Sequence, residues 1–466
     1  MEWATVTKSH LAILIVFICL CFVSSYGRSH YKNGRTEFRK DQRTVFHMSA
    51  TPDEPNQQWG YIPIRPKANI FFWLYYTTHP SGYIERPIIL WLQGGPGGSG
   101  TGFGNFEELG PDDVQLKPRN TTWTQTASVM FIDSPVGTGY SYVEDDSAYT
   151  TNVAEISADL LATMKVFIDS NKEFEKTPFY IFSESYGGKM AADFSAVLHE
   201  AISKGEIKIN FQGFAMGDSW ISPVDSTNSW GPYLYATSLV DAYGLNNINK
   251  AAKTIEELVK QGKYTEATDA WGAAEGVVED ETGGVNFYNI LDWSGSQDKI
   301  KHGLVDNRSY LDKLYDRHVR PMANDDLDAL MNGPIRKKLI IIPKNVTWGG
   351  QANNVFDKQA GDFMKNVTST VNNLIKNTSL KVIVYSGQLD LICDVLGTET
   401  WFNRLDIAEK FNNTKRQYYT CAAHLDMCYY AKTVDNVQFY WILDAGHMVP
   451  TDNGSGALAM VNRIIG

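Results

Sequence analysis

The sequence has few cysteines and no excess of positive charge. Only 5 of its 466 residues are cysteine, and 42 Lys and Arg against 53 Asp and Glu give a formal net charge of −11. The low cysteine content excludes a disulfide-dense small scaffold. An acidic chain is a poor match for the phosphate backbone, so we expect no nucleic acid partner. The sequence also lacks a CxxC pair, which excludes a metal or redox site of that type.

Long apolar runs are also scarce. The most prominent run, residues 11–23, follows Lys8 and is too short to span a bilayer comfortably. Ser25 and Gly27 provide small residues at the spacing of a cleavage site, so residues 1–27 are predicted to be a secretory signal peptide. A signal anchor is the alternative. We expect no membrane span in the mature chain and a secreted or lysosomal location.

The cysteines that remain after signal cleavage are odd in number. Cys19 and Cys21 leave with the signal peptide, and Cys393, Cys421 and Cys428 stay. Cys421 and Cys428 are close enough in sequence to close a small disulfide loop, although Cys393 could take one of them instead. One thiol is left over in either case.

Seven N-x-S/T sequons follow the predicted signal peptide. A single sequon is a weak signal, but seven in a secretory chain predict glycosylation of several and indicate surface positions. The asparagines are Asn120, Asn307, Asn345, Asn366, Asn377, Asn412 and Asn453.

Short apolar runs alternate with helical patterns along much of the chain. Strands are predicted at 70–76, 87–92, 128–132, 179–182, 209–216, 380–385 and 437–443, and helices at 152–170 and from about 188 to 203. This order predicts an α/β protein with a mostly parallel central sheet and helices on both faces. The alternation stops between about 218 and 371, which predicts an inserted, largely helical cap. Residues 28–56 are polar and are expected to be a loose lead-in.

The segment FYIFSESYGGK, residues 179–189, contains a serine at a strand-to-helix turn. A predicted buried strand ends at Ser183-Glu184-Ser185, and a helical pattern begins after Gly187 and Gly188. This is where α/β hydrolases expose their nucleophile. Ser183 stands where the usual G-x-S-x-G pattern has its first glycine, and it is also small. The alternative is an ordinary βα turn with an incidental serine.

A serine nucleophile needs a base and an acid that orients the base, in the chain order Ser, Asp, His for this fold. His447 directly follows a predicted strand, and Asp390 lies a few residues beyond another. Asp394 and Asp444 are competitors for the acid. The other histidines after Ser185 lie in helical or cap segments and are expected at the surface: His199, His302, His318 and His424.

The glycine-rich loop at 93–98, Gln-Gly-Gly-Pro-Gly-Gly, follows an early strand. An oxyanion hole needs two backbone N–H groups, and Tyr186 and this loop stand in the expected places. A phosphate-binding loop is disfavoured, because neither GK[ST] nor a helix-opening G-x-G-x-x-G is present.

Five blocks in chain order resemble the serine carboxypeptidase family and are most similar to its retinoid-inducible branch. They are WLQGGPGGSGTGFGNFEELGP, FIDSPVGTGYSY, FSESYGGK, SGQLDLICD and AGHMVP, and the resemblance runs from about residue 59 to the end. It implies an α/β-hydrolase domain over 28–466 with the cap at about 218–371. It also implies release of C-terminal amino acids from peptides or proteins at acidic pH through an acyl-enzyme, without cofactor or metal. An esterase or acyltransferase and a catalytically silent binding protein are the alternatives. The oligomeric state stays open, a homodimer included.

The resemblance also implies residue roles. Ser185 would be the nucleophile, His447 the base and Asp390 its orienting acid, with Gly95 and Tyr186 as the oxyanion donors. The substrate's terminal carboxylate would bind Gln93, Gly94, Glu108 and Glu184. Two carboxylates held close cannot both ionise cheaply, so at least one should have a raised pKa, and in its protonated form it can donate a hydrogen bond to that carboxylate. The structural alternative is that Glu108 caps a turn and Glu184 packs beside the elbow.

Three positions depart from the usual pattern of the family. Gln93 replaces an asparagine and Ser183 a glycine, which bears on rate and substrate preference more than on reaction class. Gly98 replaces a cysteine, so the resemblance implies that Cys393 is the unpaired thiol.

Overall fold

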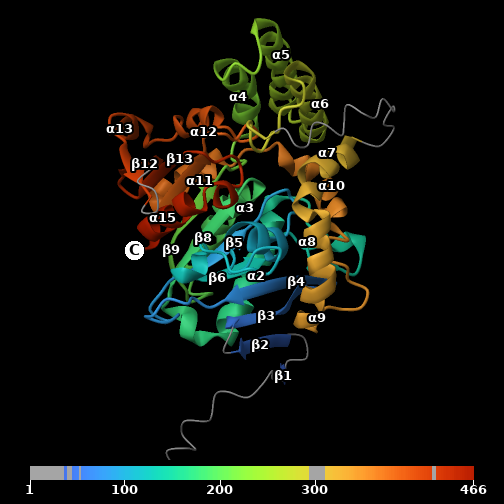
Figure 1. The fold of residues 1–466 in the computed structure, drawn as a ribbon, viewed down its shortest axis with the longest axis vertical. Coiled ribbons are helices and arrows are strands. Elements are labelled where there is room, and N and C mark those ends of the chain that lie inside the picture. The colour runs from blue at the N-terminus through green and yellow to red at the C-terminus, as the bar shows by residue number, and fades with distance from the viewer. Residues whose placement is uncertain (1–35, 39–44, 52–53, 293–309, 422–426) are drawn as a thin grey trace, which may run out of the picture.

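One mixed sheet of 13 strands runs through the described part of the computed structural model, with helices on both faces (Figure 1). The structure describes residues 36–38, 45–51, 54–292, 310–421 and 427–466. The predicted signal peptide, 1–27, lies outside these residues, as do Asn307, His302 and His424. No helix in the described ranges is long and apolar enough to cross a membrane.

Six neighbouring strands form the parallel centre of the sheet, in the order β6-β5-β8-β9-β10-β13. Parallel strands end at a common edge, so the loops that follow them meet there. The bounds are β5 Ile88–Leu92, β6 Ser128–Ile132, β8 Pro178–Glu184, β9 Asn210–Gly217, β10 Lys381–Gly387 and β13 Val437–Ile442. Each lies within a residue or two of its predicted position, and the predicted sheet is confirmed.

Alternate residues of β5 show that this centre is covered on both faces. Ile88, Leu90 and Leu92 belong to one buried apolar cluster, and Ile89 and Trp91 belong to the other. All five are buried, as expected for a central parallel strand.

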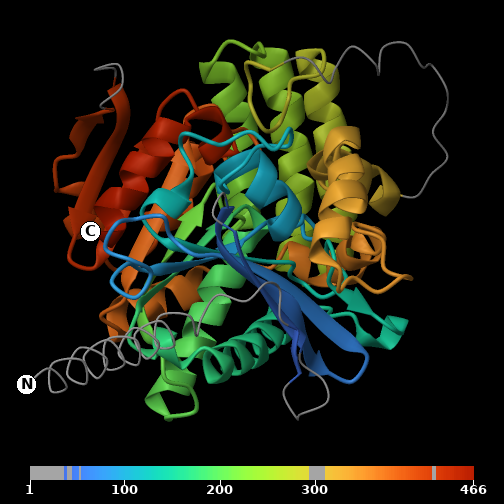
Figure 2. The same ribbon diagram turned by 60° about the horizontal axis from the view of Figure 1, so that its bottom comes forward.

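Antiparallel strands extend the sheet at both edges, on different sides of the molecule (Figure 2). They are β1 Thr36–Phe38, β2 Val45–Thr51, β3 Glu54–Arg65, β4 Ala68–Tyr75 and β7 Tyr142–Val143 at one edge, and β12 Met427–Val434 and β11 Gln417–Thr420 at the other. The expected loose lead-in at 28–56 is therefore wrong for the described residues, which form β1, β2 and the start of β3. An antiparallel edge strand does not need the continuous apolar run of a central strand, so the polar composition was misleading.

Two helices flank the nucleophile strand in sequence, α2 Val153–Ser170 and α3 Tyr186–Ser203. The side chain of Asn152 accepts a hydrogen bond from the N–H of Glu155, which explains where α2 begins. Helix α3 begins two residues before the predicted start, directly after Ser185.

Between β9 and β10 the described residues form helices and no strand. The helices are α4 Pro223–Ala236, α5 Ala242–Lys260, α6 Tyr264–Thr282, α7 Tyr310–His318, α8 Asp325–Leu330, α9 Arg336–Leu339, α10 Ala352–Phe363 and α11 Thr368–Asn377. Helices α4, α5 and α6 project together from one end of the molecule (Figure 1). The remaining helices follow β10 or β13: α12 Val395–Phe402, α13 Ala408–Asn412, α14 Val449–Asp452 and α15 Gly454–Ile465.

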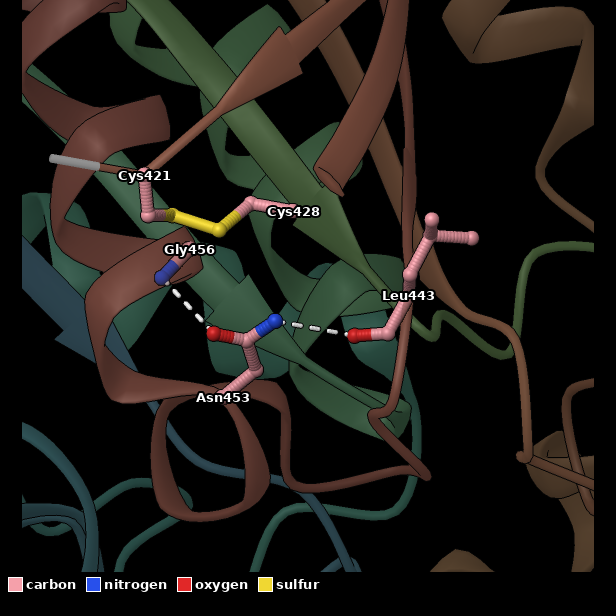
Figure 3. Close-up of a disulfide and its surroundings, with 5 residues drawn as sticks. All are labelled: Cys421, Cys428, Leu443, Asn453 and Gly456. Carbon is pink, nitrogen blue, oxygen red and sulfur yellow. Dashed lines mark hydrogen bonds between the residues drawn. A yellow bond between two sulfur atoms is a disulfide. The ribbon is translucent and has the colours of Figure 1, made fainter. Parts of the chain in front are cut away.

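A disulfide joins Cys421 to Cys428, with their Cα atoms 5.7 Å apart (Figure 3). Cys393 is a free, buried thiol. Of the three pairings that the sequence left open, the structure contains the one that closes the short loop, Cys421–Cys428.

Asn453 differs from the other described sequon asparagines. Its Oδ1 accepts from the N–H of Gly456 at 2.8 Å, and its Nδ2 donates to the carbonyl of Leu443 at 2.9 Å (Figure 3). It is half-buried and caps α15. The remaining five are exposed: Asn120, Asn345, Asn366, Asn377 and Asn412.

Candidate active site

Ser185 lies in the tight turn between β8 and α3. Its backbone has φ 60° and ψ −128°, a conformation that is strained for a residue with a side chain. Its N–H donates to the carbonyl of Gly217 at 3.0 Å, and its carbonyl accepts from the N–H groups of Gly188 and Trp220, both at 3.0 Å. These three bonds hold the turn in place.

The residues on either side of Ser185 have little space. A Cβ at Gly187 would lie 2.2 Å from the carbonyl oxygen of Leu92, and one at Gly188 would lie 2.0 Å from Ser219 Oγ. Ser183 is fully buried, and its hydroxyl donates to the carbonyl of Ala215 at 2.8 Å. A serine fits at 183 because the hydroxyl is small and has a partner.

His447 and Asp390 form a hydrogen-bonded pair. His447 Nδ1 lies 2.9 Å from Asp390 Oδ2, and both side chains are buried. The Asp390 carboxylate accepts a hydrogen bond from Nδ1–H of the imidazole, which leaves Nε2 free to act as a base. Asp394 instead caps α12 and accepts from Ser229, and Asp444 is exposed. Neither competitor reaches the histidine in this way.

The loop at 93–98 packs directly on the serine. A Cβ at Gly94 would lie only 2.5 Å from Ser185 Cβ, so a side chain there is excluded. Gly95 has φ 110°, which requires glycine. Gly94, Gly95, Ser185 and His447 line one pocket. The first N–H groups of a helix have no partner within it, so that of Tyr186 is available beside Ser185.

Gln93, Glu108 and Glu184 form a buried polar cluster next to the serine, each only 1% exposed. The Gln93 amide is oriented at both ends: Oε1 accepts from Trp91 Nε1 at 2.7 Å and Nε2 donates to Glu184 Oε1 at 2.9 Å. Glu108 comes from the π-helical segment Gly100–Leu109. In its protonated form, either glutamate can donate a hydrogen bond to an anionic ligand.

Burial governs the charge of the two glutamates. It raises the pKa of Glu108 to about 7, although the neighbouring side chains of Glu184 and Gln93 oppose the shift. Burial and the neighbouring carboxyl group of Glu108 raise the pKa of Glu184 well above its usual value. The two Glu108 oxygens and Glu184 Oε2 have no hydrogen-bond partner among the described residues. A ligand carboxylate could therefore accept a hydrogen bond from the protonated form of this pair.

Most of the pocket wall comes from residues that the sequence did not single out. The lining residues are Gly94, Gly95, Glu184, Ser185, Trp220, Trp271, Tyr288, His318, Pro321, Met322, Phe363, Ile392, His447 and Met448. Trp220, Trp271 and Phe363 have rings in mutual contact, with centroids 4.7 to 5.7 Å apart. No local motif marks these aromatics, because packing of the 218–371 segment brings them to the site.

His318 corrects one expectation. It was placed at the surface, but it is buried and lines the pocket. Its Nδ1 lies 2.8 Å from Tyr288 Oη, and its Nε2 lies 2.8 Å from Glu275 Oε1. Burial alone would raise the pKa of Glu275, but the charges of His318 and Arg317 bring it below its usual value. The buried carboxylate explains why a helical histidine points inward.

One set of side chains in the described ranges has the composition of a metal site. Ligand atoms of Asp390, Cys393 and His447 lie within 4.8 Å of one another. We assign no ion to it, because the Asp390–His447 hydrogen bond already uses two of the three groups.

The family model described as serine carboxypeptidase matches residues 49–466. The chain is 50% identical to the retinoid-inducible serine carboxypeptidases of Mus musculus and Homo sapiens, over 88% of this chain and 92% of each relative. It is also 37% identical to serine carboxypeptidase-like 51 of Arabidopsis thaliana, over 97% of this chain and 98% of that protein.

Among solved structures, a prohormone-processing carboxypeptidase from Saccharomyces cerevisiae is similar with a TM-score of 0.70. The similarity covers 89% of this chain and 92% of that one at 18% sequence identity. At this identity it supports the shared α/β-hydrolase fold and nothing finer.

Proposed function

Because the chain belongs to the serine carboxypeptidase family, we propose that Ser185, His447 and Asp390 carry out its reaction. The family resemblance of the sequence is confirmed. The protein is a serine-type carboxypeptidase, a hydrolase that acts on peptides. The assignment of its residues rests on the hydrogen-bonded His447–Asp390 pair and on the pocket shared by Ser185 and His447.

The proposed reaction proceeds in two steps. His447 Nε2 takes the proton of Ser185 Oγ as that oxygen attacks the last peptide carbonyl, and Asp390 stabilises the imidazolium. The N–H groups of Gly95 and Tyr186 stabilise the oxyanion. The C–N bond breaks as His447 protonates the departing amino acid, and a Ser185 ester remains. Water, deprotonated by His447, then attacks this ester and releases the shortened peptide.

The buried pair of glutamates, Glu108 and Glu184, would recognise the free C-terminus of the substrate. Protonated Glu108 and Glu184 would donate hydrogen bonds to the substrate carboxylate, supported by the Gln93 amide and the N–H of Gly94. Both acids ionise as the pH rises, and an ionised pair repels that carboxylate. Exopeptidase specificity and an acidic working range then have one cause, which is the raised pKa of the pair.

The segment at about 218–371 would act as the cap of a hydrolase domain spanning 28–466. It supplies Trp220, Trp271 and Phe363 to the pocket, which favours apolar substrate side chains next to the scissile bond.

A secretory location is the best fit to the rest of the chain. It rests on the apolar segment and small residues within 1–27 and on the exposed sequons. Glycosylation is proposed at Asn120, Asn345, Asn366, Asn377 and Asn412. A lysosomal or extracellular acidic compartment would match the glutamate pair.

Digestion of a blocked dipeptide tests the proposed roles. At pH 5 the parent enzyme should release leucine from N-acylated Phe-Leu, and Ser185→Ala should lower kcat by roughly 1,000-fold or more, as expected for loss of a nucleophile. A fluorophosphonate probe should label Ser185 in the parent and in Ser183→Ala, the matched control serine. Release of leucine by Ser185→Ala at the parent rate would contradict the assignment.

A further inference from the structure

Asp218 is a buried acid between the nucleophile turn and the strand that leads to Asp390. It directly follows β9 and has φ 41°, a left-handed conformation that Asp and Asn tolerate better than most residues. Its N–H donates to the carbonyl of Tyr385 at 2.9 Å, and its Oδ1 accepts from the N–H of Gly387 at 2.7 Å. Asp218 is thereby attached to β10 through both backbone and side chain.

The same turn also holds the serine. Gly217, just before Asp218, accepts from the N–H of Ser185, and Trp220, two residues after it, donates to the carbonyl of Ser185. One short segment therefore fixes the backbone of the nucleophile on one side and contacts the strand of the acid on the other.

The free end of the Asp218 side chain meets Asp390. The Asp218 carboxyl is close enough to that of Asp390 for the two to interact strongly, and Asp218 Oδ2 is buried with no hydrogen-bond partner among the described residues. Asp390 already accepts from His447 Nδ1 at 2.9 Å and from the N–H of Cys393 at 3.4 Å. Two carboxyl groups can share a hydrogen bond only if one carries a proton, and Asp390 must stay ionised to stabilise an imidazolium. If the two groups share a proton, it would therefore reside on Asp218.

We propose that Asp218 is a positioning residue for the reaction: as a neutral acid, it donates a hydrogen bond to Asp390 and holds that carboxylate against His447. The inference rests on the proposed roles of Ser185, Asp390 and His447. Asp218 does not touch the substrate in this scheme and acts through Asp390.

The surroundings support a neutral Asp218. Burial and the charge of Asp390 raise its pKa well above the usual range, although the hydrogen bonds from Gly387 and Ser386 oppose the shift. Other titratable groups interact with Asp218, Asp390 or both from each neighbouring element: Glu184 at the end of β8, Tyr385 on β10, Tyr233 on α4, Cys393 and Asp394 before α12, and His447 after β13. Loss of the Asp218 proton would place two carboxylates side by side, and their repulsion would displace Asp390.

Two substitutions of Asp218 distinguish the effect of its hydrogen bond to Asp390 from the effect of its ionisation. Asp218→Asn keeps an acceptor for Gly387 and gains an amide donor toward Asp390 that does not ionise. Asp218→Ala removes both contacts. Asp394→Asn is the matched control, because Asp394 is also a buried acid near Asp390 but bonds to Ser229 and the start of α12.

Both measurements use compounds without a free C-terminal carboxylate, so they do not depend on binding by Glu108 and Glu184. They are the rate of Ser185 labelling by a fluorophosphonate and kcat for an N-acyl amino-acid ester, each measured from about pH 5 to 10, a range wide enough for a raised carboxyl pKa. Asp218→Ala should lower both by at least about tenfold at pH 5. Asp218→Asn should restore them to within about threefold and extend the activity upward by about one pH unit or more. In Asp394→Asn, the labelling rate and kcat should fall at high pH over the same range as in the parent.

Three results would overturn the inference: Asp218→Ala within twofold of the parent, Asp218→Asn with the parent's alkaline limb, or Asp394→Asn with the same upward extension. Circular dichroism checks folding, and if Asp218→Ala does not fold, the comparison of Asp218→Asn with Asp394→Asn decides. A parent enzyme that is not labelled at Ser185 contradicts the proposed function instead. Normal labelling of the parent with unaffected Asp218 variants contradicts only the role of Asp218.

Discussion

Glu184 and Ser185 are adjacent in the chain, but their surroundings and proposed tasks differ. Glu184 is the last residue of β8 and its carboxyl contacts Gln93 and Glu108 in a buried cluster. Ser185 is in the following turn and faces the pocket. The change from strand to turn between them separates the group that would break the bond from the group that would select the C-terminus.

Replacing Glu184 with Gln should reduce the pH dependence of substrate binding. Below its raised pKa the native acid would donate a hydrogen bond to the substrate carboxylate, and above it the ionised acid would repel the substrate. The amide can donate at every pH. We expect KM of the parent for N-acylated Phe-Leu to rise about tenfold or more between about pH 5 and 8, and that of Glu184→Gln to rise less than about threefold.

The control is an ester substrate without a free carboxylate, for which KM of both enzymes should change little over the same range. A parent enzyme with the same KM for the peptide at both ends of this range would contradict the role of the glutamate pair.

At the scale of elements, strand ends and helix ends position most of the site. Ser185, Asp218, Asp390 and His447 follow β8, β9, β10 and β13, four consecutive neighbours in the sheet. Parallel pairing places these loops at one edge, so residues far apart in the sequence meet without a long-range motif. Helix ends add fixed contacts, such as the cap that Asn453 provides for α15.

The double hydrogen bond of Asn453 predicts a structural role in place of a glycan. Asn453→Ala should lower the free energy of unfolding by about 1 to 2 kcal/mol, since it removes a helix cap and a second hydrogen bond. Urea unfolding of enzymatically deglycosylated protein measures this. The matched control is Asn366→Ala at an exposed sequon, which should change the free energy by less than about 0.5 kcal/mol.

Glycopeptide mapping of the protein, expressed through a secretory pathway, supplies an independent check. Asn453 should be unoccupied while exposed sequons such as Asn366 and Asn377 carry glycans. Full occupancy at Asn453 would contradict the capping role.

At the scale of the whole molecule, several buried acids favour folding at acidic pH. Burial raises the pKa of Glu108 and of Asp394 to about 7 and that of Asp133 to about 6. Glu184 and Asp218 shift in the same direction. Between the usual carboxyl pKa and these raised values, the folded chain holds more protons than the unfolded chain. Stability is therefore lost as the pH rises through this window, by up to about 1.4 kcal/mol per pH unit for each such group.

The melting temperature should accordingly be highest near about pH 5 and at least about 5 °C lower at pH 8. Below this optimum, Glu275 loses its ion pairs as it is protonated, because its pKa is lowered in the folded state. Burial lowers the pKa of Lys189 to about 8, so its titration falls above this window and does not offset the loss. Scanning fluorimetry over pH 4 to 8 measures the curve.

Asp133→Asn and Glu108→Gln each remove one group with a raised pKa, so each should make the decline between pH 5 and 8 shallower. A melting temperature that rises steadily from pH 5 to 8 would contradict the sign of this argument.

Much of the fold and of the candidate site could be predicted from local pattern. Central strands such as β6 and the helix α2 were placed within a residue or two, because burial on both faces and helical periodicity are visible in contiguous residues. The edge strands β1 and β2 were missed, because their pairing partner, and not their composition, decides their structure. His318 and Asp218 were misplaced or overlooked for a related reason, since only packing shows what lies opposite a side chain.

The sequence by itself determined the order of the central strands, the strained serine turn, the glycine loop and the family, since each depends on a few neighbouring residues with special backbone or chemical requirements. Only the tertiary structure decided which charges meet. The contacts of Glu108 with Glu184, of Asp218 with Asp390 and of His318 with Glu275 join distant parts of the chain. Burial at these contacts sets where the protons reside, and therefore the pH at which the molecule is expected to bind substrate and to be most stable.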